Sequence, residues 1–363
     1  KIPAFGSVVL KMKAGKVSET SAFEYRGDAL TTPFAEMSFN ERGYIKSFID
    51  RRNGREICGE SYALNTFLIA EDVPLIYDSW DLDADIKNKW QDNAVLLNRQ
   101  MISEGAVECR IRSHYQLTGK STVIQDMIVY ADHPLIRFDT VINWQEDHRF
   151  LKTAFDTNLF TDTARCEIQF GYMKRGTHRN TDIDKARFEV SNYKYTDLSE
   201  MRYGVAILND CKYGISIEEG NMHHKGGNRP DDRGDKGIHR CSYGFLPHIG
   251  EFSAQNVIYP AYEFNYRPLQ VNGVLPMESL INLECDCVLA ETVKPAENGE
   301  KAVIFRLYEA EGADVTERVH FSFPVKAVEE VNMLEETKRI IAEKQDISLH
   351  FTPFEIKTIK IYY

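Results

Sequence analysis

Residues 123–142 read VIQDMIVYADHPLIRFDTVI, and this stretch decides the fold class. It holds two runs rich in β-branched and aromatic residues, 123–130 and 135–142, which follow each other closely. Runs of this length and composition are typical of β-strands. Residues 106–112 alternate apolar and polar side chains, so the strand pattern continues into the neighbouring sequence.

Tight-turn signals separate further runs of this kind. Asn53-Gly54 lies between the runs 44–49 and 55–57, which is typical of a β-hairpin, and Asn272-Gly273 and Asn298-Gly299 are two more turn signals. Helical periodicity is scarce; its best example is residues 325–344, where residues 338–341 shift the period. Many short strands at regular spacing predict an all-β chain made of β-sandwiches.

A domain boundary is expected near residues 274–276. Residues 1–275 would then form one long β-domain, and residues 276–363 would have the size of one small β-sandwich. The small sandwich has five expected strands, at residues 279–289, 302–309, 319–323, 347–350 and 355–362. The polar run 221–239 is expected to be a long surface loop.

Charge and composition exclude several classes of protein. The net charge of −11 repels phosphate backbones and anionic membranes, so nucleic acid and membrane partners are not expected. No apolar run approaches the roughly 20 residues that span a bilayer, and residues 1–6 lack the apolar core of a signal peptide.

The seven cysteines are scattered along the chain. We expect free thiols in a reducing compartment, and hence a cytoplasmic protein. Cys285 and Cys287 alternate along an expected strand, so their side chains should point to opposite faces and share no metal.

Motifs of a self-contained active site are absent from the sequence. It has no Walker A loop, no G-x-S-x-G elbow and no H-E-x-x-H helix. The adjacent His223 and His224 would face opposite ways on a strand, which makes a poor metal chelate. A glycosidase needs two carboxylates about 5–10 Å apart, but 55 acidic residues offer no way to choose a pair. The residues alone therefore support no catalytic assignment.

Three segments are dense in polar and aromatic residues. The first, residues 77–83, holds Tyr77, Trp80 and three aspartates. Sugar sites use flat rings to stack on C–H faces and carboxylates to accept hydroxyl hydrogen bonds. The alternative is a turn with solvated aspartates.

The second and third segments are rich in arginine and aspartate. Residues 175–182, continued by 186–190 and 197–200, can form a hydrogen-bonded network that fixes a long loop, and we assign Arg179 and Asp182 this bracing role. In residues 228–239, glycines permit close backbone approach and arginines can hold hydroxyls in a fork; a solvated loop is the alternative.

In this order, the three segments resemble the C-terminal region of the family 38 α-mannosidases. The most specific run is Phe170-Gly171, followed by residues 177–181, 186–190, 197–200 and 203–214. Further matching pieces extend across almost the whole chain, at residues 77–83, 144–148, 243–248, 305–309 and 353–358.

The resemblance implies a large β-super-sandwich, galactose-mutarotase-like, followed by a small C-terminal β-sandwich. It also implies retaining α-mannosidases that hydrolyse terminal α-linked mannose. Their N-terminal barrel carries a zinc ion, an aspartate nucleophile and a carboxylic acid/base, and the zinc would hold substrate hydroxyls during attack on the anomeric carbon. The family's zinc-ligand motif has no match in this chain, so zinc and the catalytic residues are expected only in the barrel.

In the family the β-region packs on the barrel and a few of its loops reach the sugar. The resemblance assigns substrate binding to the turn of Tyr77, Trp80 and Asp81 and to an arginine of the third segment. That arginine is Arg233, with Arg229 as the second choice. Asp235 and His239 match a family Asp-x-Gly-x-His pattern and would brace the loop.

The first hypothesis is therefore an accessory portion of an α-mannosidase, inactive when isolated, whose partners are the barrel and a mannose-containing oligosaccharide. An apolar surface left by a missing barrel would favour a homo-oligomer. A second hypothesis is a stand-alone carbohydrate-binding module. A third is a sugar mutarotase or epimerase, by fold analogy alone, with His114, His133, His148 and His239 as candidates. The sequence does not determine the linkage preference.

Overall fold

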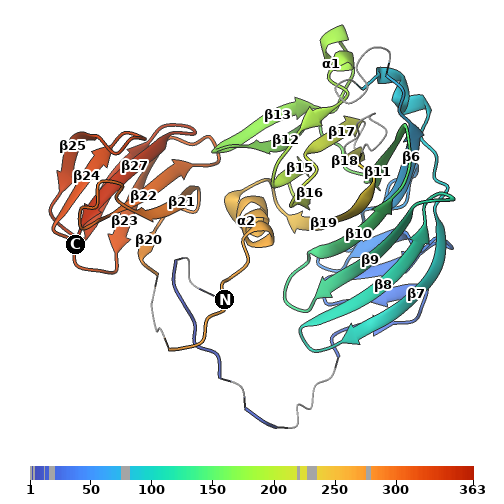
Figure 1. Ribbon diagram of the computed structural model, residues 1–363, viewed down its shortest axis with the longest axis horizontal. Helices are drawn as coiled ribbons and strands as arrows, with labels where there is room; N and C mark the ends of the chain where they lie inside the picture. Colours follow the sequence, from blue (N-terminus) through green and yellow to red (C-terminus); the bar gives the residue numbers. More distant parts are fainter. Residues whose placement is uncertain are drawn as a thin grey trace.

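The computed structural model describes residues 2, 5–11, 13–15, 21–74, 82–218, 221–226, 235–274 and 279–363. These residues form a large two-layer β-sandwich and a small β-sandwich, with a short helix between them (Figure 1). The predicted all-β fold, a large sandwich followed by a small one, is confirmed. The expected boundary near residue 275 falls in residues 275–278, which lie outside the described residues.

The first layer of the large sandwich is a nine-stranded antiparallel sheet in the order β13-β12-β15-β16-β19-β10-β9-β8-β7. Its strands are β7 (Val95–Glu104), β8 (Glu108–Gln116), β9 (Thr122–Tyr130), β10 (Ile136–Trp144), β12 (Thr163–Ile168), β13 (Gly171–Gly176), β15 (Tyr195–Ser199), β16 (Tyr203–Asn209) and β19 (Gly237–Ile249). The two runs that decided the fold class are β9 and β10, which pair directly. The long strand β19 pairs with β10 on one side and β16 on the other, and so joins the two halves of the sheet.

The second layer consists of two five-stranded sheets, one in the order β1-β2-β3-β4-β5 and one in the order β14-β17-β18-β11-β6. Their strands are β1 (Glu24–Tyr25), β2 (Ala29–Thr31), β3 (Ala35–Phe39), β4 (Ile45–Asp50), β5 (Arg55–Glu56), β6 (Thr66–Glu71), β11 (Arg149–Asp156), β14 (Val190–Ser191), β17 (Gly214–Glu218) and β18 (Asn221–Gly226). The predicted hairpin at Asn53-Gly54 joins β4 to β5, and Gly54 takes the left-handed backbone (φ 72°) that such a turn requires. Isolated bridges link the two sheets, one from Cys58 to Thr157 and one from Ile45 of β4 to Leu64 just before β6.

The polar run 221–239 is not one long loop, contrary to expectation. Residues 221–226 form β18, which pairs with β17 on one side and β11 on the other, and β19 already begins at Gly237. Pairing on both sides satisfies the backbone of β18, so a polar sequence can lie inside the sheet.

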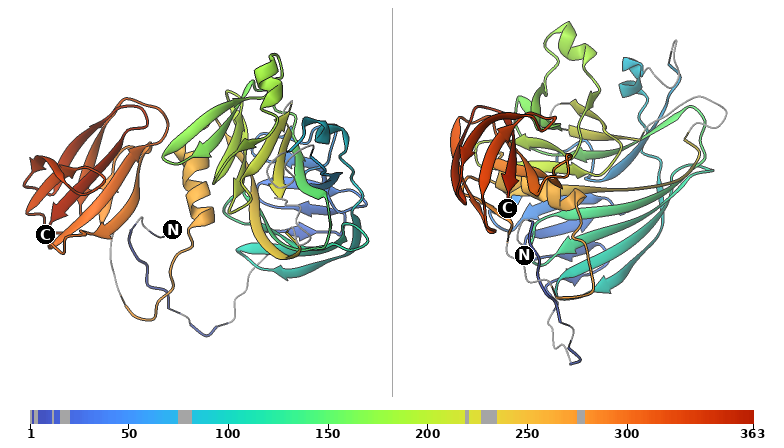
Figure 2. Two further views of the ribbon diagram at one scale, coloured as in Figure 1. Left: turned by 45° about the horizontal axis from the view of Figure 1, so that its top comes forward. Right: turned by 60° about the vertical axis from the view of Figure 1, so that its left-hand side comes forward.

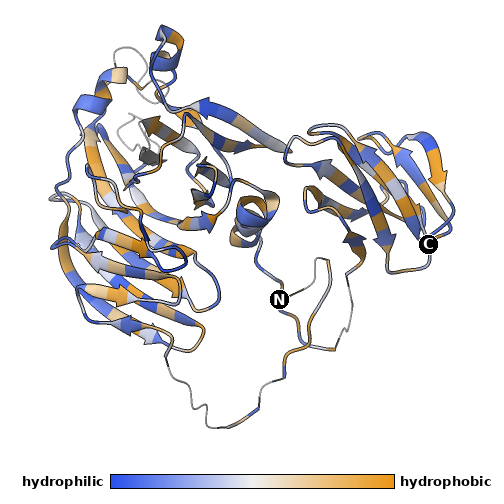
Figure 3. Cartoon of the chain, turned by 180° about the vertical axis from the view of Figure 1, so that it is seen from behind, coloured by the Kyte–Doolittle hydropathy of each residue, from blue (hydrophilic) through white to orange (hydrophobic). Residues whose placement is uncertain are grey.

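The core of the large sandwich lies between its two layers. Strand β8 shows this alternation, because Cys109, Ile111, Ser113 and Tyr115 are buried while Arg110, Arg112 and His114 are partly exposed. Figure 3 shows hydrophilic and hydrophobic residues alternating along the strands of both sandwiches. Across the layers, the rings of Phe155 on β11 and Phe245 on β19 stack with centroids 5.7 Å apart.

A buried hydrogen-bond network crosses this apolar core at Tyr243 on β19. Its hydroxyl donates to Asn65 Oδ1 (2.6 Å) and accepts from Gln125 Nε2 (2.7 Å). Asn65 Nδ2 in turn donates to Gln125 Oε1 (2.7 Å), which closes a triangle. Because Gln125 lies on β9 and Asn65 directly precedes β6, the network ties the first layer to the second.

A second polar tie between the layers is formed by Asp50 at the end of β4. Its side chain is fully buried, accepts from the Tyr203 hydroxyl of β16 (2.8 Å) and pairs with Arg52 (2.6 Å). Burial by itself raises the pKa of Asp50, but the hydrogen bonds from Arg52 and Tyr203 outweigh it and hold the pKa below its ordinary value.

The small sandwich packs a three-stranded sheet, β20-β23-β26, against a five-stranded sheet, β21-β22-β27-β24-β25. Its strands are β20 (Ile281–Leu283), β21 (Val288–Pro295), β22 (Ala302–Glu309), β23 (Val315–Phe321), β24 (Ala327–Val331), β25 (Thr337–Ala342), β26 (Asp346–Phe351) and β27 (Ile356–Tyr362). The core between the two sheets contains Phe305, Phe321, Phe351 and Ile359.

The helical interpretation of residues 325–344 is wrong, because this region is the strand pair β24 and β25. The register shifts between Val328 and Glu329 and again between Glu330 and Val331. These irregularities leave Val328 and Val331 buried three residues apart, a spacing that imitates one face of a helix.

The expected strand at 279–289 is interrupted by a turn at residues 284–287. The buried Glu317 side chain accepts hydrogen bonds from the backbone N–H groups of Glu284 and Cys285, which turns the chain out of the strand. As a result, the Cys285 and Cys287 sulfurs lie side by side at 3.4 Å instead of on opposite faces. All seven cysteines are free thiols.

The two sandwiches meet at a pair of helical turns that the sequence analysis did not predict, a π-helical turn, Ala254–Ile258, and α2 (Tyr259–Asn265). Figure 1 and the left view of Figure 2 show α2 between the sandwiches. Its apolar side chains form one buried cluster with Leu208 and Leu246 of the large sandwich and Leu289 and Tyr308 of the small one.

Ring contacts and hydrogen bonds complete the joint. Tyr308 meets Tyr262 of α2 by a hydroxyl–hydroxyl hydrogen bond (3.0 Å) and the Phe170 ring at 5.5 Å. The Phe354 ring packs on Tyr172 at 5.3 Å and against Gly171, where an added Cβ would lie only 3.0 Å from the ring. Near the N-terminus, the Phe5 ring contacts Phe305 of the small sandwich (6.4 Å).

No helix among the described ranges has the length and apolar character needed to cross a membrane.

Removal of the Tyr243 hydroxyl should destabilise the large sandwich. Tyr243→Phe leaves Asn65 Oδ1 and Gln125 Nε2 buried and short of a partner, which costs about 1–3 kcal/mol. Urea unfolding followed by tryptophan fluorescence would measure the loss. Tyr363→Phe, at the exposed C-terminus, is the control and should change stability by less than about 0.5 kcal/mol. Equal stability of the two variants would contradict the role of the network.

Asp50→Asn should destabilise the chain in a pH-dependent manner. The pKa of Asp50 is depressed on folding, so its contribution is present above the unfolded pKa of about 3.9 and is lost as pH falls through the folded pKa. We expect a loss of about 1–3 kcal/mol at neutral pH that shrinks below about pH 4. Urea midpoints between neutral pH and pH 3 would test this. A loss that stays constant over this range would contradict the assignment.

Candidate functional site

The residues expected to touch the sugar fall where the structure gives no description. Tyr77, Trp80 and Asp81 lie in residues 75–81, and Arg229 and Arg233 lie in residues 227–234; both segments are outside the described residues. Their flanking residues, however, are described and fix where each segment leaves the fold.

The first and third segments leave the same end of one sheet. Strand β6 ends at Glu71, which pairs with Arg149 of β11, and β18 ends at Gly226, which pairs with Leu151 of β11. The two strand ends are thus separated by one strand, or roughly 10 Å at about 4.8 Å per strand. The sheet therefore brings Glu71 and Gly226 close together although more than 140 residues separate them in sequence.

The second segment crosses the outer face of the same sheet. Phe188 packs on Ala70 of β6 and Phe150 of β11, beside Ile86 of the 3-10 turn Ala84–Asn88 that follows the first segment. Residues that flank all three segments therefore meet around β6, β11 and β18.

A buried ion pair lies under this crossing. The Lys152 side chain on β11 is only 1% exposed, and its ammonium pairs with Glu189 and donates to Ser216 of β17. The ammonium also lies 5.3 Å from the centroid of the Trp90 ring. The second oxygen of Glu189 is buried and accepts no hydrogen bond from any described residue.

Asp235 and His239 lie at the point where the third segment enters β19. Asp235 has left-handed backbone (φ 48°), and its carbonyl oxygen contacts Nε2 of His239. The neighbouring Lys236 pairs with Asp147 in the turn between β10 and β11. The hydrogen bond from Lys236 lowers the pKa of Asp147.

The other two predicted bracing residues have different surroundings. Arg179 donates from Nη2 to the backbone oxygen of Ile217 on β17 (2.6 Å). Asp182 begins α1 (Asp182–Ala186), but its side chain is 99% exposed and pairs only with Lys185 (3.1 Å) in the part of the chain that the structure describes.

The sequence analysis missed the residues that fix α1. The Thr181 hydroxyl accepts from the backbone N–H of Asp184, while the Asp184 carboxylate accepts from the backbone N–H of Thr181. The Thr181 hydroxyl also donates to the Asp184 carboxylate (2.7 Å), and this bond, together with that from the Thr181 backbone N–H, lowers the pKa of Asp184. The Thr-x-x-Asp spacing is a capping signal that could have predicted this helix start.

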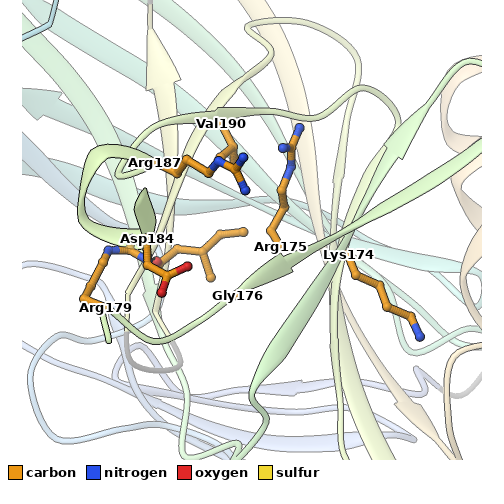
Figure 4. A pocket seen from close by; sticks show the side chains of 8 residues that line it. Lys174, Arg175, Gly176, Arg179, Asp184, Arg187 and Val190 are labelled. Carbon is orange, nitrogen blue, oxygen red and sulfur yellow. Dashed lines mark hydrogen bonds between the residues drawn. The ribbon is translucent and has the colours of Figure 1, made fainter. Parts of the chain in front are cut away.

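A small basic cleft of about 50 Å³ opens beside α1. It is lined by Lys174, Arg175, Gly176, Arg179, Asp184, Arg187, Val190 and Ile217. Figure 4 shows Arg175 and Arg187 on one side of the cleft, Arg179 and Asp184 on the other, and Lys174 pointing away. Four cations and one carboxylate give this surface a local charge opposite to that of the chain as a whole.

The described residues thus form a two-layer β-super-sandwich, an apolar joint and a small β-sandwich. Residues 30–226 match the glycosyl hydrolases family 38 C-terminal domain, and residues 288–359 match the glycosyl hydrolases family 38 C-terminal beta sandwich domain. The chain belongs to the C-terminal region of glycoside hydrolase family 38.

Curated relatives agree with the family. Alpha-mannosidase 2C1 of Mus musculus is 32% identical over 331 residues, which cover 87% of this chain and 32% of the relative. Alpha-mannosidase G of Dictyostelium discoideum is 33% identical over 355 residues, which cover 92% of this chain and 32% of the relative. The chain thus spans about a third of the length of the curated relatives it matches.

Solved structures agree with the fold. An alpha-mannosidase from Enterococcus faecalis superposes with a TM-score of 0.75 at 14% identity, over 96% of this chain and 43% of that one. At this identity the likeness concerns the fold alone.

Loss of the Thr181 cap should loosen α1. Thr181→Val removes the hydroxyl that caps the helix, at a cost of about 0.5–2 kcal/mol, so amide hydrogen exchange at residues 184–187 should accelerate. Asp182→Asn is the matched control, because this exposed side chain takes no part in the cap. Unchanged exchange in Thr181→Val would show that α1 is held by other contacts.

Proposed function

We propose that this chain is the C-terminal, non-catalytic region of a retaining α-mannosidase that hydrolyses terminal α-linked mannose. It packs on an N-terminal barrel that performs the chemistry, and its first and third segments reach the sugar. The observation that carries the proposal is that relatives named alpha-mannosidases align with 87–92% of the chain.

The geometry of the described flanks supports the assignment of substrate-binding loops. Strand β6 precedes the segment with Tyr77, Trp80 and Asp81, and β18 precedes the segment with Arg229 and Arg233. The two strands finish at the same end of one sheet, with one strand between them. In the proposed role, aromatic rings and a carboxylate from one segment and an arginine from the other hold a mannose-containing oligosaccharide. Asp235, His239 and Arg179 brace the neighbouring chain.

Zinc is assigned to the barrel. Within the ranges that the structure describes, no group of three or more His, Cys, Asp or Glu side chains could hold a metal. These residues therefore do not fit a zinc site, and no step of the proposed role runs through a metal held by this chain.

Three further proposals rest on the same structure. Separate buried clusters, residues 23–245 and 281–361, support a division into domains 1–275 and 276–363.

Seven free thiols support a cytoplasmic location. Val95, Leu97 and Ile102 are exposed on the edge strand β7, which supports coverage by the barrel or by a second copy.

The mutarotase or epimerase alternative gains no support from the geometry. His239 on β19 and His114 on β8 are three strands apart, roughly 14 Å at about 4.8 Å per strand. The basic cleft beside α1 has no histidine in its lining, and neither does a second cleft on the large sandwich, at the end of α2.

The proposed function predicts no hydrolysis of a chromogenic α-mannoside by the isolated chain, with or without added zinc. Activity should appear when the chain is joined to its barrel. In the joined enzyme, Arg233→Ala and Asp81→Ala should each lower kcat/KM by about 10- to 150-fold, the effect of losing a charged hydrogen bond of roughly 1.5–3 kcal/mol. Arg318→Ala, an exposed arginine on the small sandwich, is the control and should leave kcat/KM unchanged.

Turnover by the isolated chain, with intact mass excluding contaminating full-length enzyme, would overturn the non-catalytic role. Equal kcat/KM values for Arg233→Ala, Asp81→Ala and Arg318→Ala would overturn the assignment of the two loops.

A further inference from the structure

A second and larger cleft, which we call the tyrosine cleft, lies on the large sandwich. It is lined by Glu167, Gln169, Tyr193, Lys194, Asn209, Tyr213, Asn265 and Tyr266 and has a volume of about 270 Å³. These residues come from four places: the end of β12, the link before β15, the end of β16 with its following turn, and the end of α2. None of them belongs to the segments that carry Tyr77 or Arg233.

Aromatic rings form the walls of the tyrosine cleft. Tyr193 and Tyr213 lie with centroids 4.9 Å apart and tilted by 46°, and Tyr266 stacks on Tyr262 of α2 at 5.6 Å. Tyr213 is 46% exposed and Tyr266 is 60% exposed, so both rings present surface to a ligand. Each ring is backed by a second tyrosine, which holds it in place before a ligand arrives.

A buried ion pair forms part of the lining. Glu167 is 4% exposed; it accepts from the Lys194 ammonium and from the Lys194 backbone N–H, both at 2.8 Å. The ammonium also lies 4.6 Å from the centroid of Tyr262. Burial lowers the pKa of Lys194, but the charge of Glu167 more than offsets it, so the ammonium stays charged. The pair fixes two charged groups in one geometry.

Hydrogen-bonding capacity remains free in the lining. Asn265 Nδ2 donates to the backbone oxygens of Asn209 and Ala261, which orients its amide. No described residue donates to Asn265 Oδ1, and the exposed side chain of Gln169 has no hydrogen-bond partner among the described residues. One oriented acceptor and one unpaired amide are therefore available to a polar ligand.

The composition of the tyrosine cleft selects a class of ligand. Its one cation and one carboxylate pair with each other, so the cleft offers no net charge to an ion, unlike the basic cleft beside α1. An apolar ligand would leave the amides without partners. A pyranose ring suits both features, because its C–H faces stack on tyrosine and its hydroxyls bond to amides and charges.

The volume sets the size of the ligand. Small-molecule sites usually span about 300–1,000 Å³, and the tyrosine cleft lies just below this range at about 270 Å³. One sugar ring fits such a space better than a longer chain. We propose that the tyrosine cleft is a non-catalytic binding site for one neutral pyranose, independent of the proposed barrel and of the predicted loops at residues 77–81 and 229–233.

The test is a titration of the 363-residue chain with methyl α-D-mannopyranoside, methyl α-D-glucopyranoside and N-acetylglucosamine, followed by protein-observed NMR. We expect millimolar binding of at least one probe, with shifts at Lys194, Asn265 and Tyr266. Tyr213→Ala and Tyr266→Ala should each weaken binding about 3- to 10-fold, the effect of losing one stacked ring. Tyr266→Phe keeps the ring and should bind like the wild type.

Two controls separate this site from others. Phe160→Ala removes a 92% exposed ring elsewhere on the same sandwich and should leave binding unchanged. Arg233→Ala should also leave it unchanged, which keeps the inference apart from the proposed function. Thermal unfolding of each variant confirms that it is folded. Absence of binding for all three probes overturns the proposal, as does binding that Arg233→Ala removes and the two tyrosine variants do not.

Discussion

The rest of the structure depends on the tie that Tyr243 makes between the two layers of the large sandwich. Apolar packing between sheets is tolerant of sliding, because one buried methyl group resembles another. A closed triangle of hydrogen bonds among Tyr243, Asn65 and Gln125 accepts only one relative position of the layers. The same tie positions the sheet that contains β6 and β18 relative to the first layer.

Strand β19 connects the Tyr243 network to both ends of the large sandwich. It begins beside the Asp235–His239 contact, passes through the Tyr243 network, and ends shortly before the helical turns of the joint. Because β19 pairs along its length with β10 and β16, its two ends are held at a fixed separation. Strand β19 thus connects the Asp235–His239 contact at one end to the neighbourhood of the joint at the other.

Much of the fold could be predicted from the sequence, because strand-rich runs such as 123–142 and turn signals such as Asn53-Gly54 act locally. The strand pair β24 and β25 was not predicted, because the bulges in β24 alter the spacing of its buried side chains without altering its composition. The helical turns 254–265 were missed although Ala254, Val257, Ala261 and Phe264 follow helical spacing, because the segment is short and contains Pro260. The site was predicted by resemblance alone, and no residue pattern could have shown that β6 and β18 end beside β11.

Several stretches that carry the family resemblance lie at the joint, among them Phe170-Gly171, residues 305–309 and residues 353–358. The peptide link between the sandwiches is, in contrast, exposed at Leu269 and Val271. Attachment of the small sandwich therefore depends on side-chain packing more than on the covalent connection. A protease that cut the link would leave the two pieces associated, and the molecule would keep its shape with a broken backbone.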